Sequence, residues 1–322
     1  MLLFSIAILA GLIILVWSAD RFISGAAALA DNLGVSPMLI GLTVVGLGTS
    51  APEVLVSTMA AVNGNPGLAI GNAIGSNIAN IGLILGFTAL IIPLSVHSSV
   101  LKREYPILLA VTLLCLLLMW NGELSRFDGA ILAITLVGVL GWMIYTAKTG
   151  AADPIAGEFD AEIPHDIPTR KAIILLLVGL TFLLLSSRLL VWGATNVAVA
   201  LGVSDVIIGL TIVAIGTSLP ELAASITSAM KGEDDLAIGN VIGSNLYNML
   251  AVLSIPGLVA PGPYAPEVLT RDLPVMLGLT LFLFSMGYGF GKPGRINRLE
   301  GAILLLAFVG YQSFLFFTLV ST

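Results

Sequence analysis

The chain of 322 residues is 57% hydrophobic and only 10% charged, with a mean hydropathy of +1.06. This composition excludes a soluble globular protein, which carries about 25% charged residues, and indicates many membrane-spanning segments. The formal net charge of −6 comes without a basic stripe or motif, so it gives no sign of nucleic-acid binding. The lone Cys115 has no partner for a disulfide or for a cysteine-based metal site.

Apolar runs of about 20 residues, the length that crosses a bilayer, recur from the N-terminus to Phe317. The first run lacks the basic region and the cleavage site of a signal peptide, so it is predicted to be a span. All spans should be helices, because lipid offers no partner to unpaired backbone groups and the runs lack the alternation of a β-barrel. We therefore predict an all-α integral membrane protein whose ten transmembrane helices cover residues 2–30, 36–62, 67–92, 104–120, 127–147, 170–200, 204–230, 236–260, 272–290 and 297–319.

The longest connection, residues 150–169, contains five acidic residues and three prolines. It is predicted to be a solvated acidic linker between a first half, 1–149, and a second half, 170–322. Nine Lys and Arg residues fall in loops on the linker's side of the membrane and two on the other side. Because positive charges collect in cytoplasmic loops, we expect a cytoplasmic linker and periplasmic termini. The absence of an Asn-x-Ser/Thr sequon fits a bacterial inner membrane.

The two halves share a duplicated segment. Gly46 to Glu53 reads Gly-Leu-Gly-Thr-Ser-Ala-Pro-Glu, and Ala214 to Glu221 reads Ala-Ile-Gly-Thr-Ser-Leu-Pro-Glu. Sliding the sequence by 168 residues lays 41–81 on 209–249 and matches 22 of 41 positions. Five spans per half is an odd number, so the second half should be inverted relative to the first. Inverted repeats with interrupted helices are typical of secondary transporters, whose site lies near the membrane midplane.

The Gly and Pro of each copy should break a helix, and each break carries a glutamate. Of the nineteen Asp and Glu residues, only Glu53 and Glu221 lie near the centre of predicted spans. Each costs about 2.5–3.5 kcal/mol there without a partner, and neither motif contains Lys or Arg. The inverted repeat should make the two carboxylates face one another, and facing carboxylates repel unless a proton or a cation lies between them. The duplication therefore predicts a cation site.

Hard oxygen donors surround each glutamate in the sequence. A threonine and a serine precede it by four and three residues, and the next span carries a serine and an asparagine four residues apart on one helical face. At each break, backbone carbonyls also lose their helical partners. No Cys, Met or His stands in either motif, which favours Ca²⁺ or Na⁺ over copper and zinc. The predicted ion ligands are Glu53, Glu221, Thr49, Ser50, Thr217, Ser218, Ser76, Ser244, Asn80, Asn248, and the carbonyls of Gly46 and Ala214.

Other residues of the repeats have structural interpretations. Asn72 and Asn240 are expected to satisfy freed backbone groups rather than to bind ions. The glycines at 71, 75, 239 and 243 are expected to let helices approach closely. The Thr and Ser hydroxyls have the alternative of bonding back to their own helix.

These motifs resemble the two alpha-repeats of the sodium/calcium exchanger branch of the cation/calcium exchanger superfamily. The resemblance implies an inverted five-plus-five fold and antiport of Ca²⁺ against Na⁺ by alternating access. It assigns Glu53 and Glu221 as carboxylates shared by both ions, Ser76 and Ser244 to flanking Na⁺ positions, and the asparagines at 80 and 248 to the middle of the site. The short linker lacks the large regulatory domain of eukaryotic relatives.

Some relatives carry Asp at the place of Asn248, whereas both repeats here have Asn. The stoichiometry, and whether H⁺ or K⁺ takes part, is therefore open. H⁺/Ca²⁺ exchange and a passive cation channel remain alternatives. An intramembrane acid/base enzyme is disfavoured, because no nucleophile, metal-binding His or cofactor motif accompanies the glutamates. The sequence does not require an oligomer.

Overall fold

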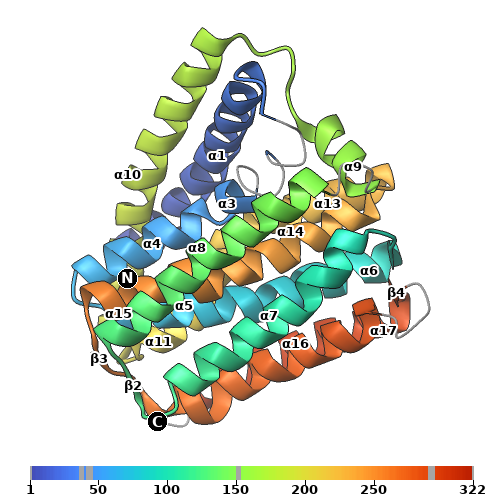
Figure 1. The fold of residues 1–322 in the computed structure, drawn as a ribbon. Coiled ribbons are helices and arrows are strands. Elements are labelled where there is room, and N and C mark those ends of the chain that lie inside the picture. Colours follow the sequence, from blue (N-terminus) through green and yellow to red (C-terminus); the bar gives the residue numbers. More distant parts are fainter. Residues whose placement is uncertain (1, 36–39, 41–45, 150–153, 289–293, 321–322) are drawn as a thin grey trace.

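The computed structural model describes residues 2–35, 40, 46–149, 154–288 and 294–320 as a helical bundle (Figure 1). The first half contains α1 (Leu2–Asn32), α3 (Gly46–Thr49), α4 (Ala51–Val62), α5 (Pro66–Ile78), the π-helix η2 (Ala79–Leu85), α6 (Gly86–Ile91), α7 (Ser99–Leu118) and α8 (Arg126–Thr149). The linker contains α9 (Pro154–Glu162). The second half contains α10 (Thr169–Leu201), α11 (Asp205–Ile208), the π-helix η3 (Gly209–Val213), α12 (Ala214–Thr217), α13 (Leu219–Lys231), α14 (Asp234–Tyr247), the π-helix η4 (Asn248–Val252), α15 (Ser254–Val259), the π-helix η5 (Val268–Asp272), α16 (Leu273–Tyr288) and α17 (Arg298–Val320).

Eight of the predicted spans are found among the described residues. Seven helices are each long and apolar enough to cross a membrane, and the bent pair Asp205–Thr217 and Leu219–Lys231 forms an eighth span. Helix α7 corresponds to the predicted span 104–120, but it begins with a charged Lys-Arg-Glu turn. The predicted span 36–62 lies partly outside the described residues. The prediction of an all-helical membrane protein is confirmed.

Both duplicated motifs break a helix as predicted, and they do so at the same residue. Ser50 separates α3 from α4 with φ −85° and ψ 4°, and Ser218 separates α12 from α13 with φ −85° and ψ 7°. Helix α13 is bent by 42° from the segment before it. Pro52 and Pro220 lie in the first turn of the second helix, where a missing N–H has no helical partner to lose. The two breaks therefore place a glutamate in the first turn of α4 and of α13.

Two short sheets show that the halves run in opposite directions. On the linker side, β1 (Leu94–Val96) of the first half pairs with β4 (Gly294–Ile296) of the second. At the opposite end of the bundle, β2 (Glu123–Leu124) of the first half pairs with β3 (Gly262–Pro263) of the second (Figure 1). A shift of 168 residues carries Leu94 onto Gly262, so equivalent strands lie at opposite ends.

The linker is partly packed against the bundle, which corrects the prediction of a wholly solvated segment. Glu158 of α9 accepts a hydrogen bond from the backbone N–H of Leu236 at 2.7 Å, in the first turn of α14. Ile163 is 4% exposed and packs on Ala27 of α1 and on Ile40. The linker thereby connects the end of α1 to the start of α14.

Helices α1 and α10 lie side by side (Figure 1), and both also pack against α4. Glycines allow this close approach, because a Cβ at Gly179 would lie 2.4 Å from the backbone nitrogen of Phe22. A Cβ at Gly25 would lie 2.5 Å from the backbone nitrogen of Leu176.

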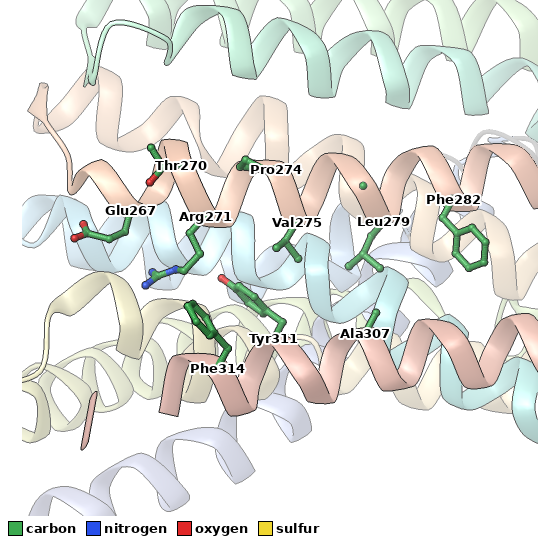
Figure 2. Close-up of a pocket in the computed structure, with 11 residues that line it drawn as sticks. Glu267, Thr270, Arg271, Pro274, Val275, Leu279, Phe282, Ala307, Tyr311 and Phe314 are labelled. Carbon is green, nitrogen blue, oxygen red and sulfur yellow. The ribbon is translucent and has the colours of Figure 1, made fainter. Parts of the chain in front are cut away.

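An open, mostly apolar groove of about 940 Å³ runs between α16 and α17 (Figure 2). Its charged end is internally satisfied: the Arg271 guanidinium binds both carboxylate oxygens of Asp272, and Tyr311 donates to the same carboxylate at 2.7 Å. The buried carboxylate of Asp272 is therefore already occupied, and Glu267 is the acidic residue among those that line the groove.

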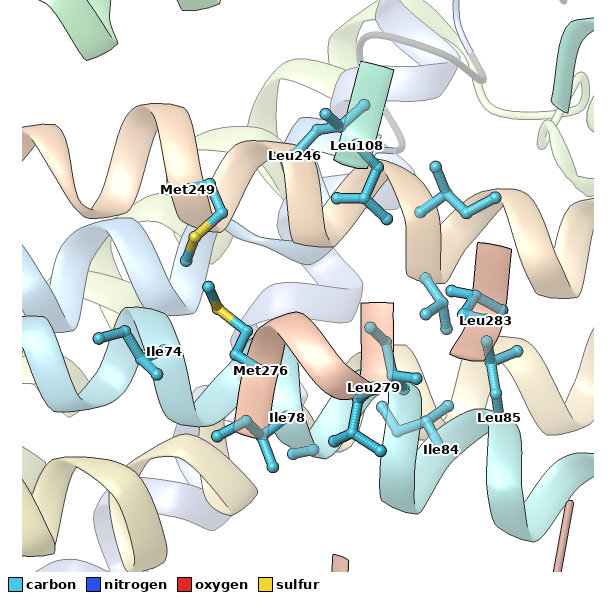
Figure 3. Packing of buried hydrophobic residues seen from close by; sticks show 14 of the residues in the cluster. Ile74, Ile78, Ile84, Leu85, Leu108, Leu246, Met249, Met276, Leu279 and Leu283 are labelled. Atoms are coloured by element: carbon cyan, nitrogen blue, oxygen red, sulfur yellow. The ribbon is translucent and has the colours of Figure 1, made fainter. Parts of the chain in front are cut away.

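The core lies between α5, α14 and α16, where Ile74, Ile78, Met249, Met276 and Leu279 pack together (Figure 3). All five side chains are buried. Close-packed interiors contain few voids and resist compression, so this core holds α5 and α14 in a fixed relation.

The duplicated glycines predict unequal tolerance to substitution. A Cβ at Gly75 would lie 2.7 Å from the Leu210 Cα and 2.7 Å from the Ala214 Cβ, whereas a Cβ at its counterpart Gly243 would meet no atom within 4 Å. Gly75→Ala should therefore cost about 1–3 kcal/mol of stability, and Gly243→Ala should cost little. The check is the thermal unfolding midpoint of each purified variant in detergent; equal midpoints for the two variants would contradict the packing.

Docking of α9 should weaken as pH rises. Burial, followed by the charges of Asp235, Glu233 and Asp234, raises the pKa of Glu158 from 4.5 to about 7. A carboxyl with a raised pKa in the docked state contributes stability that is complete below pH 4.5 and lost as pH rises through about 7. His165, whose pKa is raised by its contacts with Asp31 and Asp160, acts in the same direction.

A fluorophore on a cysteine at Ala161, which is exposed on α9, reports this docking. Its anisotropy should fall between pH 5 and pH 8 as the helix becomes mobile. In Glu158→Gln the fall should be smaller, because only His165 and its neighbours still titrate. An identical pH profile in both proteins would refute the role of Glu158.

Candidate cation site

The two repeated glutamates lie at the centre of the protein, and both are 0% exposed. Glu53 is in the first turn of α4 and Glu221 is in the first turn of α13. Ser218, which precedes Glu221 by three residues, donates to Oε1 of Glu53 at 3.2 Å. The break of the second repeat therefore lies against the carboxylate of the first.

An asparagine on the neighbouring span supports each break. Asn72 donates from Nδ2 to the Glu53 carbonyl at 3.2 Å and to the Ser57 hydroxyl at 3.0 Å. In the other half, Asn240 donates to the Glu221 carbonyl and to the Ser225 hydroxyl, both at 3.3 Å. Asn72 and Asn240 thus each hold the first turn of the helix that follows a break, through a carbonyl and a serine hydroxyl of that helix.

The same asparagines join the two halves. The Thr217 hydroxyl donates to Oδ1 of Asn72 at 3.1 Å, and the Thr49 hydroxyl donates to Oδ1 of Asn240 at 3.3 Å. Each threonine hydroxyl also lies within bonding distance of the carbonyl three residues earlier, that of Ala214 at 3.4 Å and that of Gly46 at 3.2 Å. The threonines thus combine the back-bonding alternative with a contact across the site.

One oxygen of each carboxylate is held by serines. Ser76 donates to Oε1 of Glu53 at 3.5 Å, and Ser244 donates to Oε1 of Glu221 at 3.3 Å. Ser218, from the opposite half, also donates to Oε1 of Glu53 at 3.2 Å. These three hydroxyls fix the carboxylates and leave the second oxygen of each facing elsewhere.

Five buried oxygens of the predicted ligand set have no hydrogen-bond partner among the described residues. An unsatisfied buried acceptor costs about 1–3 kcal/mol, and a bound cation or an ordered water among the five atoms would remove that cost. Carboxylate, hydroxyl and amide oxygens are the donors that hard cations prefer. The five atoms are Oε2 of Glu53, Oε2 of Glu221, Oγ of Ser50, Oδ1 of Asn80 and Oδ1 of Asn248.

The two asparagines of this set lie where each α-helix passes into a π-helix. Asn80 is the second residue of η2, and Asn248 is the first residue of η4. π-Helical turns are rare and occur frequently at functional sites, because the extra residue per turn redirects side chains and carbonyls. The carbonyls of Gly46 and Ala214, also predicted as ligands, accept hydrogen bonds in this conformation and remain predictions.

A cavity of about 480 Å³ leads from the site to the linker. It is lined by Thr49 and Asn240 at the inner end and by Glu162 and Pro164 of the linker at the outer end. On its α13 wall, Ala223 and Thr227 are exposed and Ala224 is half-buried.

The equivalent surface on the other side is closed. Val56, the counterpart of Ala224, is 0% exposed, as are Ala60 and Leu68. All three pack in a cluster with Leu190 and Val191 of α10. The site is thus accessible from the linker side, while α4 and α10 seal the opposite side with apolar side chains.

Two asparagines that contact one another and one further repeat were not predicted from the sequence. Asn77 and Asn245 contact one another across the halves, and their position in the duplicated Gly-Ser-Asn was the available signal. Leu101 to Pro106 and Leu269 to Pro274 also share the pattern Leu-x-Arg-acid-x-Pro at the same spacing of 168. The acids of that pattern, Glu104 and Asp272, are 1% and 0% exposed.

Known proteins match this chain over nearly its whole length. The family model described as sodium/calcium exchanger protein matches residues 3–145 and 171–317. CaxA of Alkalimonas amylolytica, a proposed antiporter, is 51% identical over 317 residues, covering 98% of this chain and 99% of that protein. The inner membrane protein YrbG of Escherichia coli strain K12 is 39% identical, covering 98% of each chain. The sodium/calcium exchanger MaX1 of Methanosarcina acetivorans is 31% identical, covering 96% of this chain and 97% of that protein.

A solved structure shares the fold. The sodium-calcium exchanger NCX_Mj, soaked with 100 mM Na⁺ and 10 mM Sr²⁺, matches with a TM-score of 0.67 and 33% identity over 96% of this chain and 97% of its own. Family, fold and the paired carboxylates agree. The chain belongs to the sodium/calcium exchanger family, and it is a multi-pass membrane cation antiporter rather than an enzyme.

Proposed function

We propose that this antiporter exchanges Ca²⁺ for Na⁺ through the site between Glu53 and Glu221. The observation that carries the proposal is the set of five buried, unpartnered oxygens, two of which belong to the carboxylates themselves. Two carboxylates neutralise one Ca²⁺, and the additional hydroxyl and amide oxygens raise the number of ligands toward the six to eight that Ca²⁺ prefers. MaX1 and NCX_Mj, which bear the name sodium/calcium exchanger, support the same pair of ions.

Exchange follows if Ca²⁺ and Na⁺ use the same oxygens, because occupancy is then exclusive. The apolar seal of Val56, Ala60 and Leu68 keeps a bound ion from leaving on the second side. Inverted repeats supply the complementary conformation, in which α13 and α1 close the linker side and α4 and α10 open the other. The ions then cross alternately rather than through a continuous pore.

H⁺/Ca²⁺ exchange is the second candidate. Both carboxylates are 0% exposed, and no Lys or Arg lies in either repeated motif to hold them ionised. A proton can then replace a cation between them. The neutral Asn at both 80 and 248 leaves these two as the acids of the predicted ligand set.

The proposed cellular setting is a bacterial inner membrane with the linker in the cytoplasm and both termini in the periplasm. The excess of Lys and Arg in the linker-side loops supports this orientation. The relative YrbG bears the name inner membrane protein.

Proteoliposomes loaded with Na⁺ should take up radioactive Ca²⁺ from a Na⁺-free medium, because outward Na⁺ flow drives Ca²⁺ inward. Uptake should stop when internal Na⁺ is replaced by choline. Uptake that ignores Na⁺ but follows an imposed pH gradient would instead select H⁺/Ca²⁺ exchange. Equilibration of Ca²⁺ without any counter-gradient would indicate a channel.

Glu53→Gln and Glu221→Gln should each lower Ca²⁺ uptake at least about tenfold, since losing one charge-assisted ligand costs about 1.5–3 kcal/mol. Glu123→Gln is the matched control, because Glu123 is exposed in β2 at the far end of the bundle. Insertion is checked by the elution profile in detergent. Normal uptake by both glutamine variants would refute the site.

A further inference from the structure

The hydrogen bonds around the site obey the two-fold repeat with few exceptions. Seven contacts of the first repeat recur in the second, including those of the threonines, of Asn72 with Asn240, and of Ser76 with Ser244. Such agreement makes the exceptions informative. A contact present on one side alone marks what distinguishes the two access states.

Two hydrogen bonds around the site have no counterpart among the described residues, and both end on Asn245. Asn77 donates to the backbone carbonyl of Asn245 at 3.3 Å, and Asn80 donates to its Oδ1 at 3.0 Å.

The atoms that the two-fold repeat relates to these groups are buried and have no hydrogen-bond partner. Nδ2 of Asn245 has no hydrogen-bond partner, and neither does Oδ1 of Asn77. Both polar atoms of Asn248 are unpartnered as well, at 0% exposure. The two-fold relation gives two bonds that are absent from the observed contacts. One would run from Nδ2 of Asn245 to the backbone carbonyl of Asn77, and the other from Nδ2 of Asn248 to Oδ1 of Asn77.

We propose that Asn77 and Asn245 are positioning residues that take turns in orienting the ion-binding asparagines. With the linker side open, Asn245 holds the Nδ2 of Asn80 and leaves the Oδ1 of Asn80 for the cation. With the opposite side open, Asn77 holds Asn248 in the same way. This inference rests on the proposed alternating-access antiport.

The proposed switch between Asn77 and Asn245 keeps the number and the kind of hydrogen bonds unchanged. Each state has one amide-to-carbonyl bond and one amide-to-amide bond, so the switch replaces two hydrogen bonds by two equivalent ones. A transporter needs both states to be populated, and matched bond counts keep the two free energies close. The rigid core behind α5 and α14 limits the movement to the side chains and to the π-helical turns that carry them.

Asp substitutions at Asn77 and Asn245 should each favour a different access state. Asn245→Asp keeps an oxygen to accept from Asn80 but loses the N–H that the opposite state requires, so it should favour the state open to the linker. Asn77→Asp loses the N–H that now binds Asn245 and keeps the oxygen that would accept from Asn248. Both changes add the same charge at equivalent positions, so each is the control for the other.

Accessibility of a cysteine at Thr227 reports which side is open, since Thr227 is exposed in the linker-side cavity and the native Cys115 is buried. The reaction rate with a membrane-impermeant maleimide should rise in Asn245→Asp and fall in Asn77→Asp, each by up to about fivefold, the ratio expected for one hydrogen bond. The double variant should return toward the parent rate. Shifts in the same direction, or no shift, overturn the proposal.

Alanine variants test the positioning without added charge. Asn245→Ala should raise the KM for Ca²⁺ presented on the linker side more than the KM on the other side, because it removes the group that orients Asn80. Asn77→Ala should do the reverse. Equal KM changes on both sides would show that the two residues are merely structural.

Maleimide labelling and the flux assays test the amide switch and the proposed function independently of one another. Maleimide labelling needs neither Na⁺ nor Ca²⁺, so opposite labelling shifts would uphold the amide switch even if flux assays rejected Na⁺/Ca²⁺ exchange. Exchange with unshifted labelling would uphold the function and reject the switch.

Discussion

The structure depends on the repulsion between two buried carboxylates. Glu53 and Glu221 are held at 0% exposure by helix breaks that no other part of the fold requires. Placing like charges together in a low dielectric is tolerable only with a positive charge between them. The asparagines that support the breaks, the serines that fix one carboxylate oxygen and the unpartnered oxygens that remain all follow from this constraint. We therefore expect the site to need a cation or a proton between the two carboxylates.

Inversion explains why so regular a site is asymmetric. Two inverted copies can be equivalent only if access is equal from both sides, so that the site is either open to both sides or closed to both. Packing prevents this: α4 and α10 meet through Val56, Ala60 and Leu68, while the α13 surface with Ala224 and Thr227 faces a cavity. The same asymmetry separates Gly75, in tight contact, from the open surroundings of Gly243. Near-identical sequences thus occupy different environments because only one access side is open at a time.

The linker contributes to this asymmetry from outside the repeats. Glu158 accepts from the first turn of α14, and Ile163 packs on Ala27 of α1. Glu162 and Pro164 line the outer end of the cavity. A segment that belongs to neither copy thus lies against the open side, and it has no inverted counterpart. It joins α1 to α14, the elements on either side of the pathway.

The sequence alone determined the membrane class, the duplication, the helix breaks and the residue types of the site. Hydropathy and a spacing of 168 residues are properties of the linear chain, and a charge within an apolar span needs a partner in any fold. Three features were not predicted, because each depends on segments that are distant in sequence. They are the contact between Asn77 and Asn245, the burial of Glu104 and Asp272, and the docking of α9. The sequence also did not predict which side of the site is open. An inverted repeat permits two conformations of nearly equal energy that are related by the two-fold axis, and only the packing of α1 and α10 against α13 and α4 selects between them.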